Sequence, residues 1–344
     1  MSSILTRSLL LLSLALPTLA VAGEELDGGT FSVYFENDLF TGTDRYYTNG
    51  VKLGWSSTDL AKYGDTPYAS PLLPILERIP FINNPAFQKN LSFSLGQNIY
   101  TPDNTEALER LDDDRPYAGW LYLGFGVAWK NADIRHSLSL NIGVVGSWSY
   151  GEEAQRVVHE ARGLAVPKGW DNQLHNELGV LLAYEATWRW PKHERRVGLD
   201  WEFLPHLGFS VGNVLTAVNV GGEFRFGVNL PDDFGTPGIE PSATTSTPVE
   251  GAERAGRARK FDLGMYLFAR ADGRAIAHTV FLDGNTFGNS ASADKKVLVA
   301  DLSVGASLNY KDTKVTYAVI YRTQEFEAQE EAQLFGSVSF NFAF

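Results

Sequence analysis

Cysteine is absent from this 344-residue chain, and only two methionines are present. The absence of cysteine excludes a disulfide scaffold, a thiol nucleophile, and zinc or iron–sulfur sites that are built on thiolates. Positive charge is also scarce, because 29 Lys and Arg face 41 Asp and Glu and the formal net charge is −12. Nucleic-acid binding needs a cationic surface, so we expect no nucleic-acid partner. Apolar runs of 18 residues are missing beyond the N-terminus, which argues against a bundle of membrane helices.

The N-terminal segment has the three parts of a secretory signal peptide. Arg7 precedes the apolar run at 8–19, and the small-x-small sequence Ala20-Val21-Ala22 follows. A membrane anchor is the alternative, but the apolar run is short for a bilayer span and ends in a cleavage site. We therefore predict a signal peptide at 1–22 and a single exported barrel domain at 23–344.

Apolar residues alternate with small or polar residues through the rest of the chain. In 138–144, Leu, Leu, Ile and Val alternate with Ser, Asn and Gly, and in 338–344 Val and Phe take every second position. A period of two is typical of strands with one apolar face. A soluble β-sandwich would show the same local pattern. Three features favour a membrane barrel: strands long enough to cross a bilayer, a polar face rich in Gly, Ser and Asn, and aromatic residues near the strand ends.

The C-terminal strand, with its alternating aromatic residues and terminal Phe344, resembles the assembly signal of bacterial outer-membrane barrels. We predict an all-β fold, a twelve-stranded antiparallel transmembrane β-barrel with both termini on the periplasmic side. The predicted strands are 30–38, 46–57, 89–100, 117–130, 134–148, 178–191, 196–211, 215–229, 260–271, 296–310, 313–325 and 333–344. Residues 274–282 could form a thirteenth strand, but closure favours an even number, and we assign them to a loop.

Polar residues that fit neither strand nor turn roles gather in four stretches. These stretches are 36–38 with 44–50, 97–102, 112–117 and 151–177. In the predicted topology the odd-numbered strands run outward, so all four stretches lie at extracellular strand ends or loops. Four polar clusters on one rim indicate a candidate site.

A short helix is predicted in the longest of these stretches. Residues 152–164 place Ala, Val and Leu at i, i+3, i+4 and i+7 spacing. His159 lies in this helix, and histidine is the natural general base near neutral pH. An exposed helix histidine without a catalytic role is the alternative, and His175 on the same rim is a competitor for the role of base.

Acidic residues on the predicted rim offer hard oxygen ligands. They are Asp38, Asp44, Asp112, Asp113 and Asp114, and calcium is the cation that such ligands suit. No contiguous calcium-binding loop is present, so a solvated acidic surface is the alternative. A Gly-x-Ser-x-Gly nucleophile elbow is also missing. A His-activated water, or a serine or threonine nucleophile outside that motif, remains as the route to hydrolysis.

Seven short motifs follow one another along the chain. They are Asn37-Asp38, Tyr47-Thr48-x-Gly50, Gln97-x-Ile99-Tyr100-x-Pro102, Asp114-Arg115, Gly-Val-Val-Gly at 143–146, Gln155…His159 and Trp170…Gln173. In this order and spacing they resemble the lipid A deacylase family of outer-membrane barrels. The resemblance implies a twelve-stranded barrel in the outer membrane of a Gram-negative bacterium. It also implies calcium-dependent removal of the 3′-acyloxyacyl group of lipid A at a site that faces the outside.

The resemblance assigns roles to four residues. The Asn-Asp pair of the family falls on Asn37 and Asp38, and Asp38 is the calcium-associated residue. The essential Thr falls on Thr48 and the catalytic His on His159. In that scheme His159 activates water against the ester carbonyl, while Ca²⁺ polarises the carbonyl and stabilises the oxyanion.

One position departs from the family, because its best-known member has a functional Glu six residues after the His and this chain has Ala165. Glu160 or Glu177 could compensate, or the substrate or rate could differ. The implied partner is lipid A or lipopolysaccharide of the outer leaflet, and we expect a membrane-embedded monomer. The alternatives are an outer-membrane phospholipase or other lipid esterase, and a non-catalytic porin-like barrel.

Overall fold

The computed structural model describes residues 28–38, 42, 45–69, 73–78, 81–111, 113–191, 198–236, 238–239 and 263–344. The predicted signal peptide, Asp44 and Asp112 lie outside the described residues. In the ranges that are described, no helix is long and apolar enough to cross a membrane.

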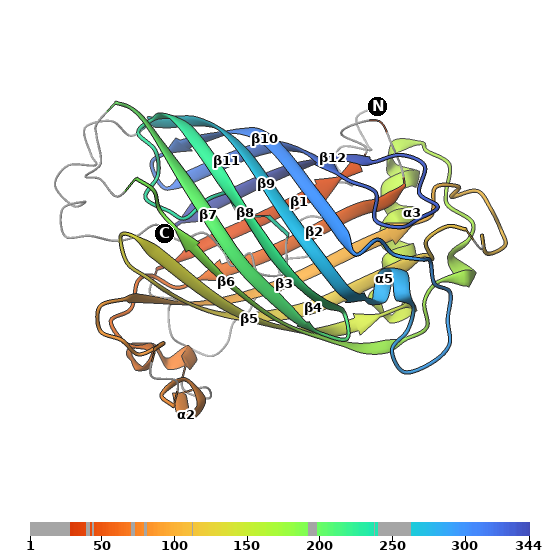
Figure 1. The fold of residues 1–344 in the computed structure, drawn as a ribbon, viewed down its shortest axis with the longest axis horizontal. Coiled ribbons are helices and arrows are strands. Elements are labelled where there is room, and N and C mark those ends of the chain that lie inside the picture. Colours follow the sequence, from red (N-terminus) through yellow and green to blue (C-terminus); the bar gives the residue numbers. More distant parts are fainter. Residues whose placement is uncertain are drawn as a thin grey trace.

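Twelve antiparallel strands form a closed barrel in which β1 completes the ring against β12 (Figure 1). The strands are β1 (Thr30–Asn37), β2 (Tyr46–Ser56), β3 (Gln88–Thr101), β4 (Ala118–Lys130), β5 (Ile134–Val145), β6 (Glu177–Trp188), β7 (Leu199–Gly212), β8 (Leu215–Val228), β9 (Leu263–Thr279), β10 (Leu298–Tyr310), β11 (Thr313–Arg322) and β12 (Gln333–Ala343). The predicted twelve-stranded antiparallel barrel is confirmed.

The assignment of residues 274–282 to a loop is wrong. β9 continues through Thr279, and a single helical turn, α5 (Val280–Asp283), follows it directly. The outward positions of this part of β9 are small residues, Ala271, Gly273 and Ala275, while Arg274 on the lumen side binds Asp301 of β10 at 2.6 Å. Small outward residues and charged inward ones weaken the apolar alternation from which strands are predicted.

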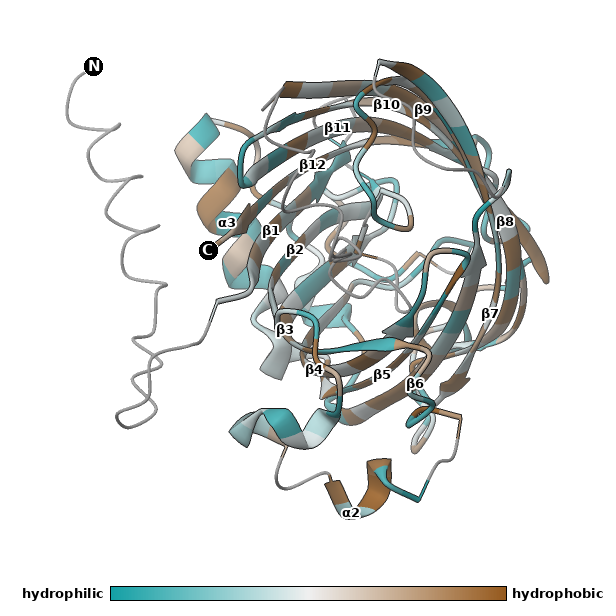
Figure 2. Ribbon diagram, turned by 90° about the vertical axis from the view of Figure 1, so that its left-hand side faces the viewer, coloured by the Kyte–Doolittle hydropathy of each residue, from teal (hydrophilic) through white to brown (hydrophobic). Residues whose placement is uncertain are grey.

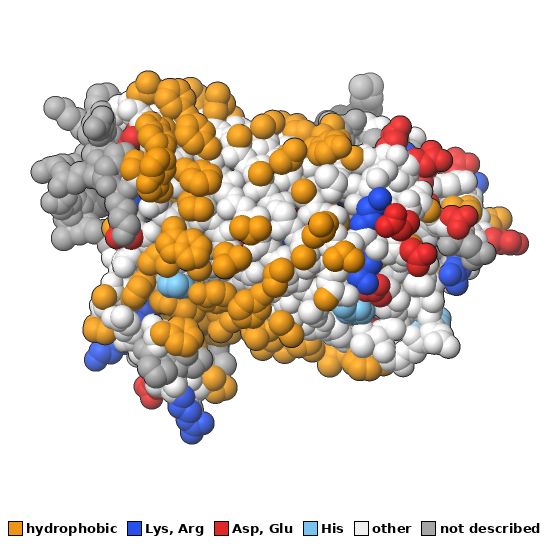
Figure 3. Space-filling view, in the orientation of Figure 1, with side chains coloured by type: hydrophobic (Ala, Val, Ile, Leu, Met, Phe, Trp, Pro, Cys, Tyr) orange, Lys and Arg blue, Asp and Glu red, His pale blue; other side chains and the backbone are white. Residues whose placement is uncertain are grey.

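The two ends of the barrel differ. At one end lie the start of β1 and the end of β12, where the Gly29 N–H donates to the Phe344 carbonyl. We call this the termini end. At the other end the odd-numbered strands finish, and a helix in the connection from β5 to β6, α3 (Gly151–Arg162), lies there with α5. We call this the α3 end, and charged side chains gather on its surface (Figure 3).

Side chains alternate between a polar lumen and an apolar outer surface. On β10, Leu302 and Val304 are exposed on the outside, whereas Asp301 and Ser307 are buried on the inside. The strands viewed from the termini end alternate in hydropathy along their length (Figure 2). Such a surface suits a barrel whose outer wall contacts lipid.

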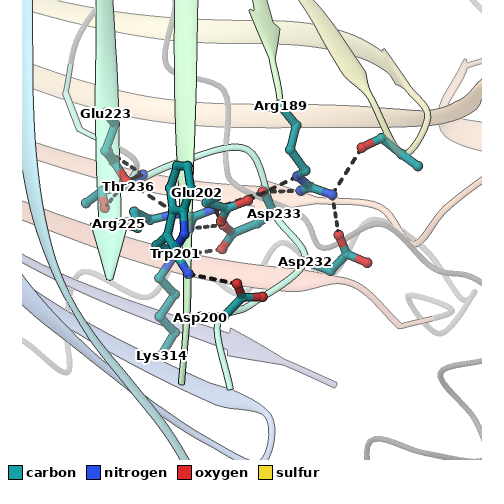
Figure 4. Close-up of polar contacts among 11 residues, drawn as sticks. Arg189, Asp200, Trp201, Glu202, Glu223, Arg225, Asp232, Asp233, Thr236 and Lys314 are labelled. Atoms are coloured by element: carbon teal, nitrogen blue, oxygen red, sulfur yellow. Dashed lines mark hydrogen bonds and ion pairs between the residues drawn. The ribbon is translucent and has the colours of Figure 1, made fainter. Parts of the chain in front are cut away.

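A segment that follows β8 folds back into the lumen. The carboxylate of Asp233 binds Arg225 of β8 at 2.5 Å and Lys314 of β11 at 2.8 Å (Figure 4). The N–H of Ile239 then donates to the Glu36 carboxylate of β1 at 3.2 Å. Because these partners lie on different sides of the ring, the segment crosses the lumen.

An aromatic cluster fills the lumen near the α3 end. Phe281 of α5 stacks on Tyr100 of β3 with ring centroids 4.1 Å apart, and it also approaches Trp120 of β4. Tyr47 of β2 meets Phe335 of β12 edge-on at 5.1 Å. The segment that follows β8 reaches from Asp233 near the termini end to Ile239 near this aromatic cluster.

Candidate functional site

Three polar side chains face the outside of the wall at the α3 end. Asn37 ends β1, Thr101 ends β3, and Thr48 lies in a β-bulge of β2 between Tyr47 and Asn49. A bulge re-aims a side chain, and here Thr48 joins Asn49 on the outer side. The Asn37 amide donates to the Thr48 carbonyl at 2.9 Å, and the hydroxyls of Thr48 and Thr101 are 2.7 Å apart.

Asn37, Thr48 and Thr101 are all buried although they lie on the lipid-facing side of the barrel. A polar group without water needs hydrogen-bond partners, which the contacts above supply. Burial on the outside of the wall also means that other segments of the chain cover these residues. We call Asn37, Thr48, Asn49 and Thr101 the outer patch, and Asp38 follows Asn37 directly in the chain.

Asp38 directly follows β1 and is fully buried. One of its carboxylate oxygens accepts the backbone N–H of Arg45 at 2.6 Å, so the carboxylate closes the connection between β1 and β2. The Arg45 guanidinium in turn binds Asp103 and Glu331 at 2.7 Å each. The hydrogen bond to Asp103 is the largest cause that raises the pKa of Arg45, so Arg45 stays charged. Arg45 thereby links the β1–β2 connection to the β3–β4 and β11–β12 connections.

The connection from β5 to α3 crosses the outside of the wall toward β3. The Gly146 N–H donates to the Gly119 carbonyl of β4 at 3.1 Å, and the Gln97 amide of β3 donates to the Ser149 carbonyl at 2.6 Å. Gly119 permits this close approach, because a Cβ there would lie 2.0 Å from the Ser149 hydroxyl oxygen. α3 therefore starts over β4 and β3, outside the barrel (Figures 1 and 2).

One face of α3 turns toward the wall. Its buried residues are Gly151, Gln155 and His159, spaced four apart and so on one face. The Trp170 indole donates to the Gln155 side-chain oxygen at 2.9 Å and packs against Ile99 of β3. His159 lies about 12 Å along the helix from Gly151, which corresponds to two or three strand spacings. α3 therefore extends along the outside of the wall by this distance from its start over β4 and β3.

His159 has a defined hydrogen-bond partner. Its Nδ1 lies 2.5 Å from the backbone carbonyl oxygen of Ala165. A carbonyl oxygen only accepts, so Nδ1 carries the proton and donates. In the neutral ring Nε2 is then the nitrogen that accepts a proton.

The turn that ends α3 makes this contact possible. Gly163 has a left-handed backbone, with φ +70°, and the Leu164 N–H donates back to the His159 carbonyl at 2.9 Å. This left-handed helix end reverses the chain. It brings Ala165 back over the His159 ring.

The two residues proposed to replace the family's Glu, Glu160 and Glu177, are placed differently from His159. Glu160 is exposed on α3, and Glu177 accepts the N–H of Thr286 at 2.9 Å on the side of the barrel near α5. The His159 ring therefore has a backbone carbonyl as a hydrogen-bond partner, at the position where the family's best-known member has a carboxylate.

The other acidic candidates and His175 lie elsewhere. Asp114 accepts the backbone N–H groups of Asp103 and Arg115 at 2.6 and 2.7 Å, which braces its loop. Burial raises the pKa of Asp114, although these two bonds oppose the shift. Asp113 and His175 are exposed on the rim.

Calcium would find oxygen ligands in the outer patch. Within the described ranges, no three His, Asp and Glu side chains are close enough to hold a metal. A calcium site would therefore combine Asp38 with neutral oxygens. The side-chain oxygen of Asn49 is buried without a hydrogen-bond partner, and Asn49 pairs with Asn37 across β1 and β2. Carboxylate and amide oxygens are ligands that calcium accepts, so the donor set fits this ion.

Sequence reasoning assigned no role to Asn49, Thr101 or the carbonyl of Ala165. Thr101 stands inside one of the polar stretches, and this position was its only signal. Thr48 acquires its outward place from the bulge, which alternation does not predict, whereas Asn49 follows the alternation of Val51 and Leu53.

The comparisons with known proteins agree with this architecture. The family model described as outer membrane protein LpxR matches residues 8–344. Among solved structures, LpxR from Salmonella typhimurium is similar with a TM-score of 0.71 and 20% identity, over 92% of this chain and 100% of that chain. The β domain of the Bordetella autotransporter BrkA gives a TM-score of 0.44 and 10% identity, over 92% and 99%.

No curated protein matches the chain. The likeness to the Salmonella structure supports the fold, and the family model covers nearly the whole sequence. This protein belongs to the outer membrane protein LpxR family, the outer-membrane lipid A deacylases that its motifs resemble.

Proposed function

We propose that this deacylase removes the ester-linked 3′-acyloxyacyl group of lipid A by a calcium-dependent hydrolysis in which His159 activates water. The observation that carries the proposal is the bond from His159 Nδ1 to the Ala165 carbonyl. It selects the tautomer whose Nε2 accepts a proton, and His159 lies on the buried face of α3.

The residues of the outer patch support distinct steps. His159 takes the proton of the attacking water at Nε2. When the Thr48 hydroxyl accepts a hydrogen bond from the Thr101 hydroxyl, its own O–H is free to donate to the oxyanion that develops on the ester carbonyl. Asn37 fixes the Thr48 backbone through its amide. Calcium held by Asp38 and the Asn49 amide oxygen would supply Lewis-acid polarisation of that carbonyl.

The proposed site faces the outside of the cell. Lipid A lies in the outer leaflet, and a patch on the outer surface of the wall meets such a lipid without passage through the lumen. The start of β1 and the end of β12 lie at the opposite end of the barrel, and in bacterial outer-membrane barrels this is the periplasmic end. The charged surface at the α3 end suits an aqueous rim (Figure 3).

A porin-like barrel is disfavoured by the filled lumen. Asp233 near the termini end and Ile239 near the α3 end hold a segment within it, and Phe281 stacks within it at the α3 end. A phospholipase with the same catalytic groups is the second candidate, because the ester chemistry is shared. The two candidates differ in their substrate, lipid A or a phospholipid.

Purified protein should release one acyloxyacyl group from lipid A in calcium-containing detergent micelles. Mass spectrometry of the lipid products measures the mass loss, and the same reaction on phosphatidylethanolamine tests the alternative. Lipid A that stays intact while lysophospholipid accumulates would refute the deacylase and establish the phospholipase.

The helix end at Gly163 should control the rate of hydrolysis. A Cβ at Gly163 meets no atom within 4 Å, so a substitution there acts through backbone strain. A left-handed residue with a Cβ costs about 1–2 kcal/mol, which corresponds to a rate loss of roughly tenfold if the Ala165 carbonyl shifts. Gly163→Val should therefore lower kcat about tenfold with KM unchanged.

Gly163→Asn is the matched control, because asparagine tolerates a left-handed backbone. It should keep kcat close to that of the unmodified protein. Equal kcat in the valine and asparagine variants would show that the position of the Ala165 carbonyl does not matter for the histidine.

A further inference from the structure

The connection from β2 to β3 packs against the outside of the barrel at the termini end. It is described at 57–69, 73–78 and 81–87 and contains two short 3₁₀ turns and α2 (Leu73–Leu76). Figure 1 shows α2 projecting beside the barrel wall. We call this connection the 57–87 element. Its Tyr63 and Ile82 are buried in a cluster with Leu91 of β3 and Trp129 of β4.

The 57–87 element takes the place of lipid on the wall. Along the outer face of β3, Leu95 and Phe93 are 41% and 40% exposed, whereas Leu91 is fully buried. On β4, Leu123 is exposed and Val127 is buried in the same way. All five side chains point outward by alternation along their strands. The element therefore covers outward apolar positions that continue the exposed apolar surface of these two strands.

A buried lysine holds the 57–87 element against the wall. The Lys89 ammonium of β3 donates to the carbonyls of Ala61, Asn84 and Phe87 at 2.9, 3.2 and 2.9 Å. The Tyr63 hydroxyl adds a bond to a β4 carbonyl at 2.9 Å. Hydrogen bonds from the first and the last part of the 57–87 element therefore fix its position along the barrel axis.

The outer surface of the 57–87 element is amphipathic. Ile75 and Phe81 are 59% and 61% exposed, while Glu77 and Arg78 stand exposed beside them. The Phe81 ring is 5.6 Å from the ring of Trp129, so it continues the aromatic surface of the wall. In Figure 3 apolar side chains extend from the belt of the barrel onto the projection at its lower left, with cationic side chains at the tip.

We propose that the 57–87 element is an interfacial anchor that inserts Ile75 and Phe81 among the acyl chains of the phospholipid leaflet at the termini end. The occupant follows from continuity, because an element that packs within the lipid-facing belt is itself bordered by lipid. Exposed apolar side chains beside a cationic one suit the boundary between acyl chains and headgroups, where Arg78 meets lipid phosphates. Aromatic side chains favour the same depth.

Single cysteines test this proposal cleanly, because the chain has none. Ile75→Cys and Phe81→Cys, each in the full chain, are labelled with an environment-sensitive fluorophore. The labelled proteins are reconstituted into vesicles of phosphatidylethanolamine and phosphatidylglycerol with spin-labelled phospholipid. Leu123→Cys on the exposed wall is the lipid control, and Asp113→Cys on the rim is the water control.

We expect the fluorophores at positions 75 and 81 to emit at short wavelength and to be quenched by spin-labelled lipid, as at position 123. Emission and quenching at both positions equal to those at position 113 would overturn the anchor, because the element would then face water. Heat-dependent gel migration confirms that each variant is a folded barrel. The readout is independent of hydrolysis, so it does not depend on the proposed function.

Discussion

Replacing His159 with alanine should reduce calcium-dependent deacylation of lipid A by about 10²–10⁴-fold, the usual contribution of a general base. The substitution removes the Nε2 acceptor and leaves the helix otherwise intact, since α3 also contacts the wall through Gly151 and Gln155. The reaction is followed by mass spectrometry of lipid A at saturating calcium. The loss should appear in kcat, because the base acts on water rather than on substrate binding.

His175→Ala is the matched control for this experiment. His175 is exposed on the same rim, and its described bonds are made by its backbone, to the side chain of Asn285. Its removal should leave the rate of deacylation within a factor of about two, as expected for a surface substitution. Full activity of His159→Ala, or a comparable loss in His175→Ala, would remove His159 from the role of base.

The alternation of apolar and polar residues predicted the barrel, because one face of each strand meets lipid and the other face meets the polar lumen. Strands such as β5, with Leu138 and Leu140 outside and Ser137 and Ser139 inside, carry a clear period of two. The second half of β9 carries Arg and Asp toward the lumen and Ala or Gly toward the outside, so its pattern disappears. The missed extension of β9 is thus a region where the side chains toward the lumen are charged and the outward side chains are small.

The sequence predicted which side chains belong to the candidate site, but not which side of the wall each of them faces. Motif order placed Asn37, Thr48 and His159 on one rim, and the structure adds that Asn37 and Thr48 meet on the outer side of the wall. Glu36, the immediate neighbour of Asn37, points into the lumen and binds Tyr47 at 2.9 Å. Alternation separates these adjacent residues by the full thickness of the wall, which the clustering of polar letters could not reveal.

Ala165 shows a different limit of sequence reasoning. The alanine side chain indicates that a functional carboxylate is missing from this position. The backbone carbonyl oxygen of the same residue, however, accepts a hydrogen bond from His159 Nδ1. Every residue has a carbonyl, so no letter of the sequence marks the one that is used. The left-handed Gly163 is the indirect signal, because glycine after a helix predicts the reversal that brings the carbonyl back.

Removal of calcium should abolish hydrolysis, and Asp38→Asn should weaken calcium binding, so that the variant needs much more calcium for activity. The amide of the variant keeps an oxygen that accepts the Arg45 N–H, so the connection between β1 and β2 is preserved. It removes the carboxylate charge at the end of β1, where the remaining candidate ligands are neutral oxygens such as that of Asn49. We expect the half-saturating calcium concentration to rise by about 100-fold or more.

Two measurements separate a metal role of Asp38 from a structural one. Titration of chelator-treated protein with calcium gives the activity curve, and terbium luminescence sensitised by nearby tyrosines reports binding without substrate. Asp113→Asn, an exposed rim carboxylate, is the control and should leave both curves in place. If Asp38→Asn lowered the maximal rate at unchanged calcium and terbium affinity, Asp38 would position the rim through Arg45 rather than hold the ion. An anionic lipid and an acidic wall repel each other, so a cation that both coordinate would explain why a carboxylate is buried at this edge of the barrel.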